Sequence, residues 1–268
     1  MPAEILDIPA ADYHAIEALS SSGMRLLELS PAHFRAGWRE ATEAMEFGTA
    51  AHACLLQPGE FADSYVCGPS GDKRTKAVKD AWASCEAANP GKIIVRGEDW
   101  PALEGIRRAV WEHPAARRLL LDVAETEASI IWDDPAGPAK CKSRLDAVTS
   151  TDRLVLDLKI VTQVGDARPE RFARKINEFR YDRQAAMYRR ALLAAGQSWG
   201  GHVWIVVESP PPHGVMVYAA SDYDIMEADH EIDRLIETYA RCVQSGEWPA
   251  YPAGVVTLSR PDWARRER

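Results

Sequence analysis

The chain has 268 residues, and its 32 basic and 40 acidic side chains give a formal net charge of −8 at pH 7. A chain of this length can fold without disulfides or a structural metal, and its acidic balance disfavours a protein that coats nucleic acid through charge alone. The five scattered cysteines form no metal-binding pair, no stretch approaches the ~18 apolar residues of a membrane span, and the first residues lack a secretory signal, so we expect reduced thiols and a soluble, cytoplasmic protein without membrane contact.

The first 121 residues are predicted to be mainly helical. Ser20 is a candidate N-cap, and Ser30 is a second N-cap followed by proline at the first helical position, so two short helices meet there. Apolar residues with a period of about 3.6, interrupted by turn residues such as those at 89–91, define the remaining helices. The helices predicted in this part cover about 23–29, a short segment from 31, 42–56, 72–88 and 100–121.

After residue 121 the apolar period changes from about 3.6 to about 2, which marks the entry into a sheet. The predicted strands cover about 125–132, 140–148, 153–160, 202–207 and 214–218, and the predicted helices cover about 168–195 and 222–243. We therefore expect an α/β fold with a mixed central sheet flanked by helices, in one domain over residues 1–268. Its parts are a mainly helical segment over 1–121, the sheet core over 122–220, and a C-terminal helix and tail over 221–268.

Acidic and basic side chains converge on two of the predicted strands. Alternation over 153–160 puts Asp157 and Lys159 on the polar side of a strand whose other side is leucine and isoleucine. If this strand forms a hairpin with the preceding one through a four-residue loop, Asp146 lies opposite Val155 and diagonal to Asp157. This group suits metal-assisted phosphodiester hydrolysis, with the two aspartates as Mg²⁺ ligands and the lysine orienting the attacking water. An ion pair on a solvated face of the sheet is the alternative.

Two further motifs accompany this strand pattern. Gly48 and His52 share one face of a predicted helix, where the glycine would let the helix approach the sheet, and Gln184 and Tyr188 share one face of the helix after the strands. With the aspartates and the Asp157-Leu-Lys motif, their order resembles the PD-(D/E)xK nuclease superfamily in its RecB-like and RecE-like branch. Both ends of the chain also resemble phage and prophage exonucleases of the exodeoxyribonuclease VIII type, so the resemblance covers nearly the whole chain.

The resemblance implies a role for each of these residues. His52, which alone would be interpreted as a buried core histidine, becomes a metal ligand beside Asp146 and Asp157, and Glu127, at the opening of the preceding strand, becomes a possible auxiliary acid. Residues 168–190 carry eight basic and three acidic side chains, which suits a track for DNA phosphates. The residues expected either to support the metal ligands or to contact DNA are Gln184, Tyr188, Arg180 and Arg183.

The sequence departs from the superfamily pattern at two positions, because Leu145 stands where proline is expected and Asp157 is the shorter of the two permitted acids. The resemblance implies a Mg²⁺-dependent exodeoxyribonuclease, with Mn²⁺ as a substitute, that degrades double-stranded DNA from its 5′ ends. Such relatives form rings around DNA and leave 3′ single strands for a RecT-like annealing protein in phage-type recombination. The alternatives are a RecB-like nuclease with another polarity or a single-stranded substrate, and an inactive module that binds DNA ends.

Overall fold

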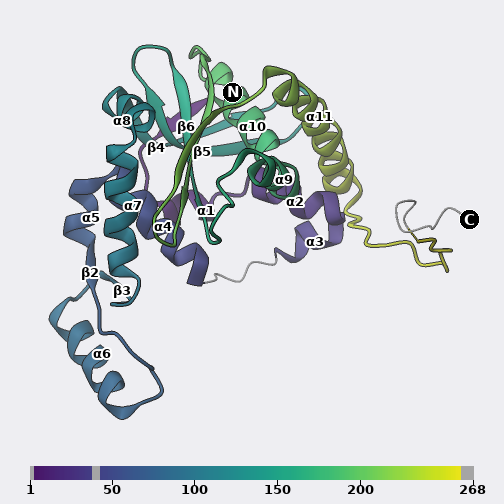
Figure 1. The fold of residues 1–268 in the computed structure, drawn as a ribbon. Helices are drawn as coiled ribbons and strands as arrows, with labels where there is room; N and C mark the ends of the chain where they lie inside the picture. The colour runs from purple at the N-terminus through teal and green to yellow at the C-terminus, as the bar shows by residue number, and fades with distance from the viewer. Residues whose placement is uncertain (1–2, 38–42, 261–268) are drawn as a thin grey trace, which may run out of the picture.

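The computed structural model describes residues 3–37 and 43–260, which form a mixed α/β fold with a six-stranded sheet flanked by helices (Figure 1). The helices are α1 Ala10–Ala15, α2 Ser21–Leu29, α3 Pro31–Ala36, α4 Glu43–Leu56, α5 Pro58–Ser64, α6 Lys76–Ala88, α7 Trp100–Glu112, α8 Pro114–Leu121, α9 Pro169–Phe179, α10 Tyr181–Ala194 and α11 Asp222–Ser245. The strands are β1 Glu4–Leu6, β2 Tyr65–Cys67, β3 Ile93–Val95, β4 Val123–Asp133, β5 Lys140–Thr149, β6 Leu154–Val161, β7 Gly201–Glu208 and β8 Val215–Ala219. The expected fold class is confirmed.

The main sheet has the strand order β1-β4-β5-β6-β7-β8. All its neighbouring strands are antiparallel except β6 and β7, which are parallel because α9 and α10 connect them. The short strands β2 and β3 form a separate parallel pair at the base of the segment that carries α6 (Figure 1). The five strands predicted from alternation are therefore all present, whereas β1, β2 and β3 were not predicted.

Helices cover both faces of the central strands. On one face, Val155 of β6 packs in the cluster that contains Phe172 of α9, Met187 of α10 and Ile232 of α11. On the other face, the neighbouring β6 residues Leu156 and Leu158 pack against Leu55 of α4 and against α7 and α8. Alternate residues of β6 thus point into two hydrophobic clusters, and the side of this strand that carries Asp157 and Lys159 is buried under α10.

Two of the long helices predicted from the sequence are interrupted. The helix expected over 100–121 is divided at His113, because Pro114 has no backbone N–H to continue the first helix and instead starts the second. The His113 side chain caps this second helix by accepting a hydrogen bond from the Ala116 N–H. The helix expected over 168–195 is divided at Arg180, which adopts the left-handed conformation with φ 58° and ψ 46°. The Arg180 guanidinium pairs with Glu231 of α11, an interaction distant in sequence.

Smaller outcomes complete the comparison. The helix start expected near residue 42 lies outside the described residues, and α1 and α5 were not predicted. All five cysteines are free, as expected. Among the helices that the structure describes, each is too short or too polar to span a bilayer.

The register of the β5–β6 hairpin differs from the expectation. Val148 pairs with Val155, and Ala147 pairs with Leu156, so Asp146 is not opposite Val155. Continuing the observed register by one step places Asp146 against Asp157, two residues from the expected pairing. The loop has the four residues assumed from the sequence, but it spans residues 150–153 and leaves Thr149 and Leu154 at the strand ends, one residue later than expected. A shift of the loop by one residue moves the pairing partner by two.

Candidate active site

The strands β5 and β6 separate at Asp146. Their backbone pairing ends at Ala147 and Leu156, and beyond this point Asp146 Oδ2 accepts a hydrogen bond from the Leu158 N–H at 3.0 Å. A side-chain carboxylate thus takes the place of a backbone carbonyl and satisfies a buried amide. The separation lets side chains from both faces of the sheet meet between the two strands.

Glu127 lies beside Asp146 on the neighbouring strand. Pairing of β4 with β5 on either side of this position puts Glu127 opposite Asp146, inside β4 rather than at its opening as expected. Its φ of 53° is the left-handed conformation, which costs a non-glycine residue about 1–2 kcal/mol. Arg144 Nε donates to Glu127 Oε2 at 2.6 Å, and Arg144 also donates to Ser129 Oγ. The strained backbone and the arginine together fix the direction of this carboxylate.

His52 reaches the same place from α4. Its Nδ1 is 3.3 Å from Asp146 Oδ2, and one ligand atom from each of His52, Glu127 and Asp146 lies within 4.8 Å of the other two. The fully buried Ala50 and Ala51 allow α4 to pack closely in the core. Gly48 is not what allows this approach, because a Cβ at that position would meet nothing within 4 Å.

Asp157 and Lys159 enter from the α10 side of the sheet. Lys159 Nζ is 2.6 Å from Asp157 Oδ2 and donates to Gln184 Oε1 at 2.9 Å, and Gln184 Nε2 donates to the Tyr188 hydroxyl at 2.7 Å. Lys159 Nζ also lies 4.4 Å from the centre of the Tyr181 ring. The Gln184 and Tyr188 pair on α10 therefore holds the lysine in place, as the expected supporting role requires.

Burial and charge set the protonation of the site. Burial raises the pKa of Asp146 to about 6, against the lowering effect of Lys159, and burial likewise raises the pKa of Asp157 to about 6. Burial lowers the pKa of Lys159, but the two aspartates outweigh it and the pKa lies above its usual value. Burial, aided by Lys159, lowers the pKa of His52. At neutral pH the site holds a neutral imidazole and a charged lysine among carboxylates that are costly to ionise.

This donor set fits a divalent metal ion. Imidazole nitrogen and carboxylate oxygen suit Mg²⁺ and Mn²⁺, and a cation would relieve the cost of the buried negative charges. Apart from its ion pair with Lys159, Asp157 has no hydrogen-bond partner for either oxygen among the described residues. The compact group includes Glu127 as its third member, whereas the sequence had suggested Asp157. Asp157 is close to Asp146, a member of this group, and the charge of Asp146 also raises the pKa of Asp157.

Most of the basic residues expected to form a phosphate track pair with acidic side chains of the protein, whereas Arg168 and Arg174 are exposed and have no ion pair among the described residues. Arg183 is fully buried and pairs with Glu28 at 2.7 Å and with Glu231 at 4.0 Å, so its assignment as a DNA contact is wrong. Arg180 pairs with Glu231 and Asp182. The same holds for Arg171 and Lys175 with Asp166, for Arg189 with Asp229, and for Arg190 with Asp134, Asp229 and Asp233. The ion pairs of these basic residues connect α9 and α10 to neighbouring segments of the protein.

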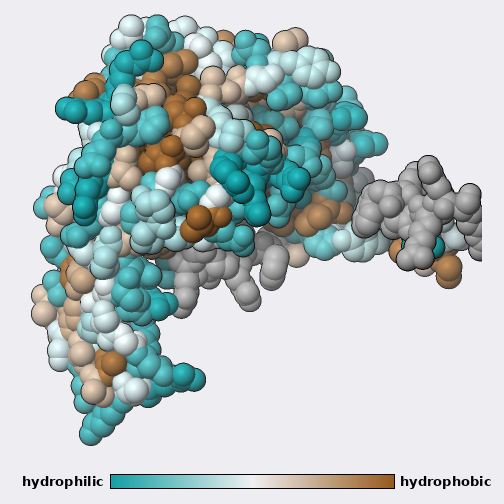
Figure 2. Space-filling model, viewed as in Figure 1, coloured by the Kyte–Doolittle hydropathy of each residue, from teal (hydrophilic) through white to brown (hydrophobic). Residues whose placement is uncertain are grey.

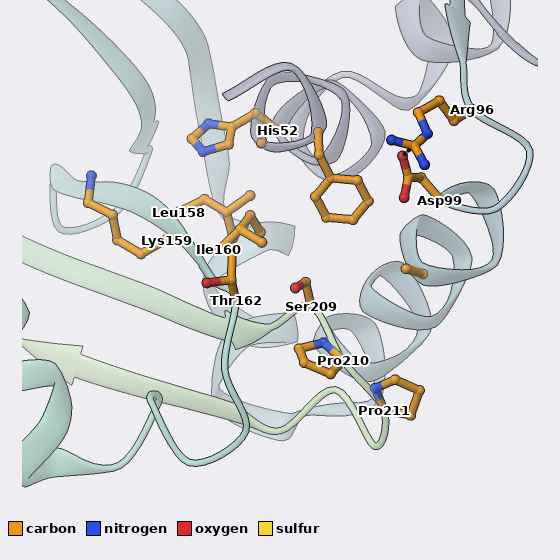
Figure 3. Close-up of a pocket in the computed structure, with 13 residues that line it drawn as sticks. His52, Arg96, Asp99, Leu158, Lys159, Ile160, Thr162, Ser209, Pro210 and Pro211 are labelled. Carbon is orange, nitrogen blue, oxygen red and sulfur yellow. Dashed lines mark ion pairs between the residues drawn. The ribbon is translucent and has the colours of Figure 1, made fainter. Parts of the chain in front are cut away.

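A cavity of about 610 Å³ adjoins the site (Figure 3). His52 and Lys159 lie at one end of it, and Arg96 and Asp99 lie at the other, with Phe47 among its lining residues. Sequence reasoning did not identify Arg96 or the Arg144 that holds Glu127. For Arg144 a signal existed, since a basic residue two positions before Asp146 in a largely buried strand requires a partner.

Comparisons with known proteins agree with this geometry. The family model described as a PDDEXK-like domain of unknown function, DUF3799, matches residues 20–260. A crystal structure from Eubacterium rectale, described as a "Putative exonuclease", shares 13% identity with a TM-score of 0.61 and covers 96% of each chain, which shows the same fold. A second structure, SSO0001, has 12% identity, covers 47% of this chain and 52% of its own, and has a TM-score of 0.28, too low to support an argument. No curated protein matches the sequence. Because this family model matches most of the chain, residues 20–260, the chain belongs to the PDDEXK-like family DUF3799.

Proposed function

We propose that this protein is a metal-dependent DNA exonuclease. The observation that carries the proposal is the gathering of three carboxylates, one neutral imidazole and one ammonium group at the opening between β5 and β6. Buried carboxylates whose pKa values are raised mark a functional site more often than a structural one. The fold of the family supports a nuclease over other hydrolases.

The residues divide the work between holding a metal and handling water. His52, Glu127 and Asp146 would hold the ion, with Asp157 as a further oxygen donor. A bound Mg²⁺ or Mn²⁺ would supply Lewis-acid stabilisation of charge on the scissile phosphate. Lys159, held by Gln184, would donate a hydrogen bond to the attacking water and favour its hydroxide form. Tyr188 keeps the Gln184 amide in the orientation that accepts from the lysine.

We infer the finer activity from the resemblance to RecE-like enzymes. The protein would digest double-stranded DNA from its 5′ ends and leave 3′ single strands for a RecT-like annealing protein. It would assemble as a homo-oligomeric ring around DNA, so that processivity follows from topology rather than from affinity. Sedimentation of the purified protein tests the ring, since a monomer in solution contradicts it.

A duplex with different labels at its 5′ and 3′ ends tests the reaction. With Mg²⁺ we expect early release of mononucleotides that carry the 5′ label. Early release of the 3′ label would reverse the polarity, and hydrolysis of single strands alone would favour the other RecB-like activity. If the protein binds the DNA ends without hydrolysing them, the inactive end-binding module is the correct interpretation. Asp146→Asn protein purified in parallel controls for contaminating nucleases.

The inactive module is disfavoured by the state of the site. Glu127 has a strained left-handed backbone, and burial raises the pKa of Asp146 to about 6; both features are typical of working sites. Lys159 and its supporting Gln184 are also in place.

A further inference from the structure

Residues 65–97 form an arm that leaves the body between α5 and α7 (Figure 1). The parallel pair of β2 and β3 forms its base, and α6 forms its outer part with no buried residue. The outer end of the arm is mostly hydrophilic (Figure 2). A helix with no buried residue contributes little to the core, so its side chains are free to contact a partner.

The arm is basic although the chain is acidic. It carries six basic and three acidic residues, whereas the whole chain has a net charge of −8. Some of these charges are used locally: Arg74 pairs with Asp72, and Lys73 Nζ lies 3.7 Å from the centre of the Trp82 ring. The remaining lysines are exposed and have no acidic partner among the residues that the structure describes; they are Lys76, Lys79 and Lys92.

Two cavities that share part of their lining lie between the arm and the candidate active site. The cavity beside His52 and Lys159 is also lined by Phe47, and by Arg96 and Asp99 at its far end (Figure 3). The same three residues line a second cavity of about 420 Å³, whose other wall includes Lys73 and Trp82 of the arm. The two cavities therefore adjoin, and a polymer bound at the metal ligands can continue along α4 to the base of the arm.

The distribution of charge selects a polyanion as the partner. The basic residues of α9 and α10 are largely paired within the protein, so the arm supplies positive charge that faces solvent near the site. Exposed lysines on a helix bind backbone phosphates without reading sequence, as an exonuclease requires. We propose that the arm binds the backbone phosphates of duplex DNA whose end is hydrolysed at the metal site, an inference that rests on the proposed function.

The test removes two lysines of the arm and compares an equal loss of charge elsewhere. The Lys76→Gln/Lys79→Gln variant changes two exposed residues in the first turns of α6, and glutamine has nearly the same helix propensity as lysine. The matched control is Arg117→Gln/Arg118→Gln, which changes two exposed residues of α8, beyond the far end of α7. Binding of a labelled blunt duplex is measured by fluorescence anisotropy in Ca²⁺ over a range of salt concentrations.

We expect the arm variant to bind duplex about tenfold more weakly, and its plot of log affinity against log salt to lose about two units of slope, one for each phosphate contact. The control variant should keep the affinity and slope of the parent, and both variants should melt at the parent temperature. Unchanged binding by the arm variant, or an equal loss in the control, overturns the assignment of the arm.

The outcomes also separate this inference from the proposed function. If the parent hydrolyses DNA and the arm variant binds it normally, the arm is wrong and the nuclease stands. If binding depends on the arm and no metal gives hydrolysis, the arm stands and the nuclease is wrong. A parent that neither binds nor hydrolyses duplex contradicts both. If the parent binds single strands more tightly than duplex, and the arm variant loses that binding to the same extent, the arm binds single-stranded DNA and the duplex assignment is wrong.

Discussion

At the scale of single residues, the buried charges of the candidate site lower the free energy of unfolding of the metal-free protein. Asp146 is mostly buried, and burial raises its pKa to about 6, well above the usual value of an aspartate. The folded protein therefore holds a proton on Asp146 more tightly than the unfolded chain does. Below about pH 4 both states are protonated and ionisation costs nothing, whereas above about pH 6 both are ionised and the folded state carries the full penalty.

The Asp146→Asn variant should consequently separate function from stability. Its amide oxygen can still accept the Leu158 N–H, and it carries no buried charge. We expect hydrolysis to be abolished, while the metal-free variant is more stable than the parent by about 1–3 kcal/mol at pH 8 and by much less near pH 4. Urea unfolding at the two pH values measures the difference. A less stable variant at pH 8 would indicate a structural ion pair instead.

Lys159 should affect the chemical step more than binding. Replacement by Met keeps most of the apolar stem and removes the charge that Asp157 and Gln184 hold. Metal and DNA should still bind, and single-turnover hydrolysis should slow by orders of magnitude. Lys140→Met, an exposed position on β5, is the matched control and should keep the parent rate. An unchanged rate with lost metal affinity would assign Lys159 to another role.

His202 is a buried histidine behind Asp157 whose two ring nitrogens lack hydrogen-bond partners among the described residues. Burial, with a smaller effect of Lys159, lowers its pKa to about 3. Because the unfolded state takes up a proton near pH 6.5 and the folded state resists it, the parent loses stability from His202 as pH falls from about 6.5 toward 3.

A His202→Leu variant should escape this loss. Relative to its value at pH 7.5, the stability of the variant minus that of the parent should rise by about 2 kcal/mol at pH 5. Denaturant unfolding at several pH values gives this difference and cancels the opposite contribution of the aspartates. A difference that stays constant with pH would show that folding does not shift the pKa of His202.

At the scale of elements, sequence pattern located the strands and missed what depends on distant contacts. Alternating residues identified β4, β5 and β6 because both the apolar and the polar positions repeat locally. The interruption at Arg180 has neither glycine nor proline, and its ion pair with Glu231 joins segments about fifty residues apart. The β5–β6 register depended on the exact position of the four-residue loop, which pattern does not determine, so Asp146 was placed two residues from its partner.

Arg183 illustrates a residue whose sequence context was misleading. In a basic stretch it resembled a DNA contact, but its guanidinium links α10 to Glu28 of α2 and to Glu231 of α11. Arg183→Leu should lower stability by about 1–3 kcal/mol, a moderate loss because both glutamates keep some contact with water. The folded variant should bind DNA with the parent affinity and salt dependence. Weaker binding at unchanged stability would restore the DNA contact.

At the scale of the whole molecule, the site joins segments that sequence proximity cannot connect. His52 on α4 and Asp146 on β5 are more than ninety residues apart, and they approach from a helix and a strand of different parts of the fold. Local pattern indicated the aspartates and the lysine, whereas only the resemblance to a family indicated the histidine. The resemblance also indicated Glu127 as a possible auxiliary acid, but its place in the group with His52 and Asp146 needed the structure, since nothing in the sequence signals a left-handed residue within a strand.

A metal ion bound across these segments should stabilise the entire fold. Binding to the folded state alone adds about 2.7 kcal/mol at a metal concentration 100 times Kd, so Mn²⁺ should raise the melting temperature of the parent. His52→Ala should lose much of this increase at pH 8, where the imidazole is neutral and available as a ligand. Gln57→Ala, near the end of the same helix and outside the site, is the control and should respond like the parent.

The pH dependence of this stabilisation distinguishes the ligands. Because burial raises the pKa of Asp146 and of Asp157 to about 6, protons compete with the metal at the carboxylates below about pH 6. Metal affinity should therefore decrease as the pH is lowered in both the parent and His52→Ala. The difference in affinity between the two proteins that remains at pH 8 is the contribution of the histidine. Calorimetric titration with Mn²⁺ at pH 5, 6.5 and 8 measures both effects. Equal affinities of the two proteins at pH 8 would place His52 in the core and leave Glu127, Asp146 and Asp157 as the metal site.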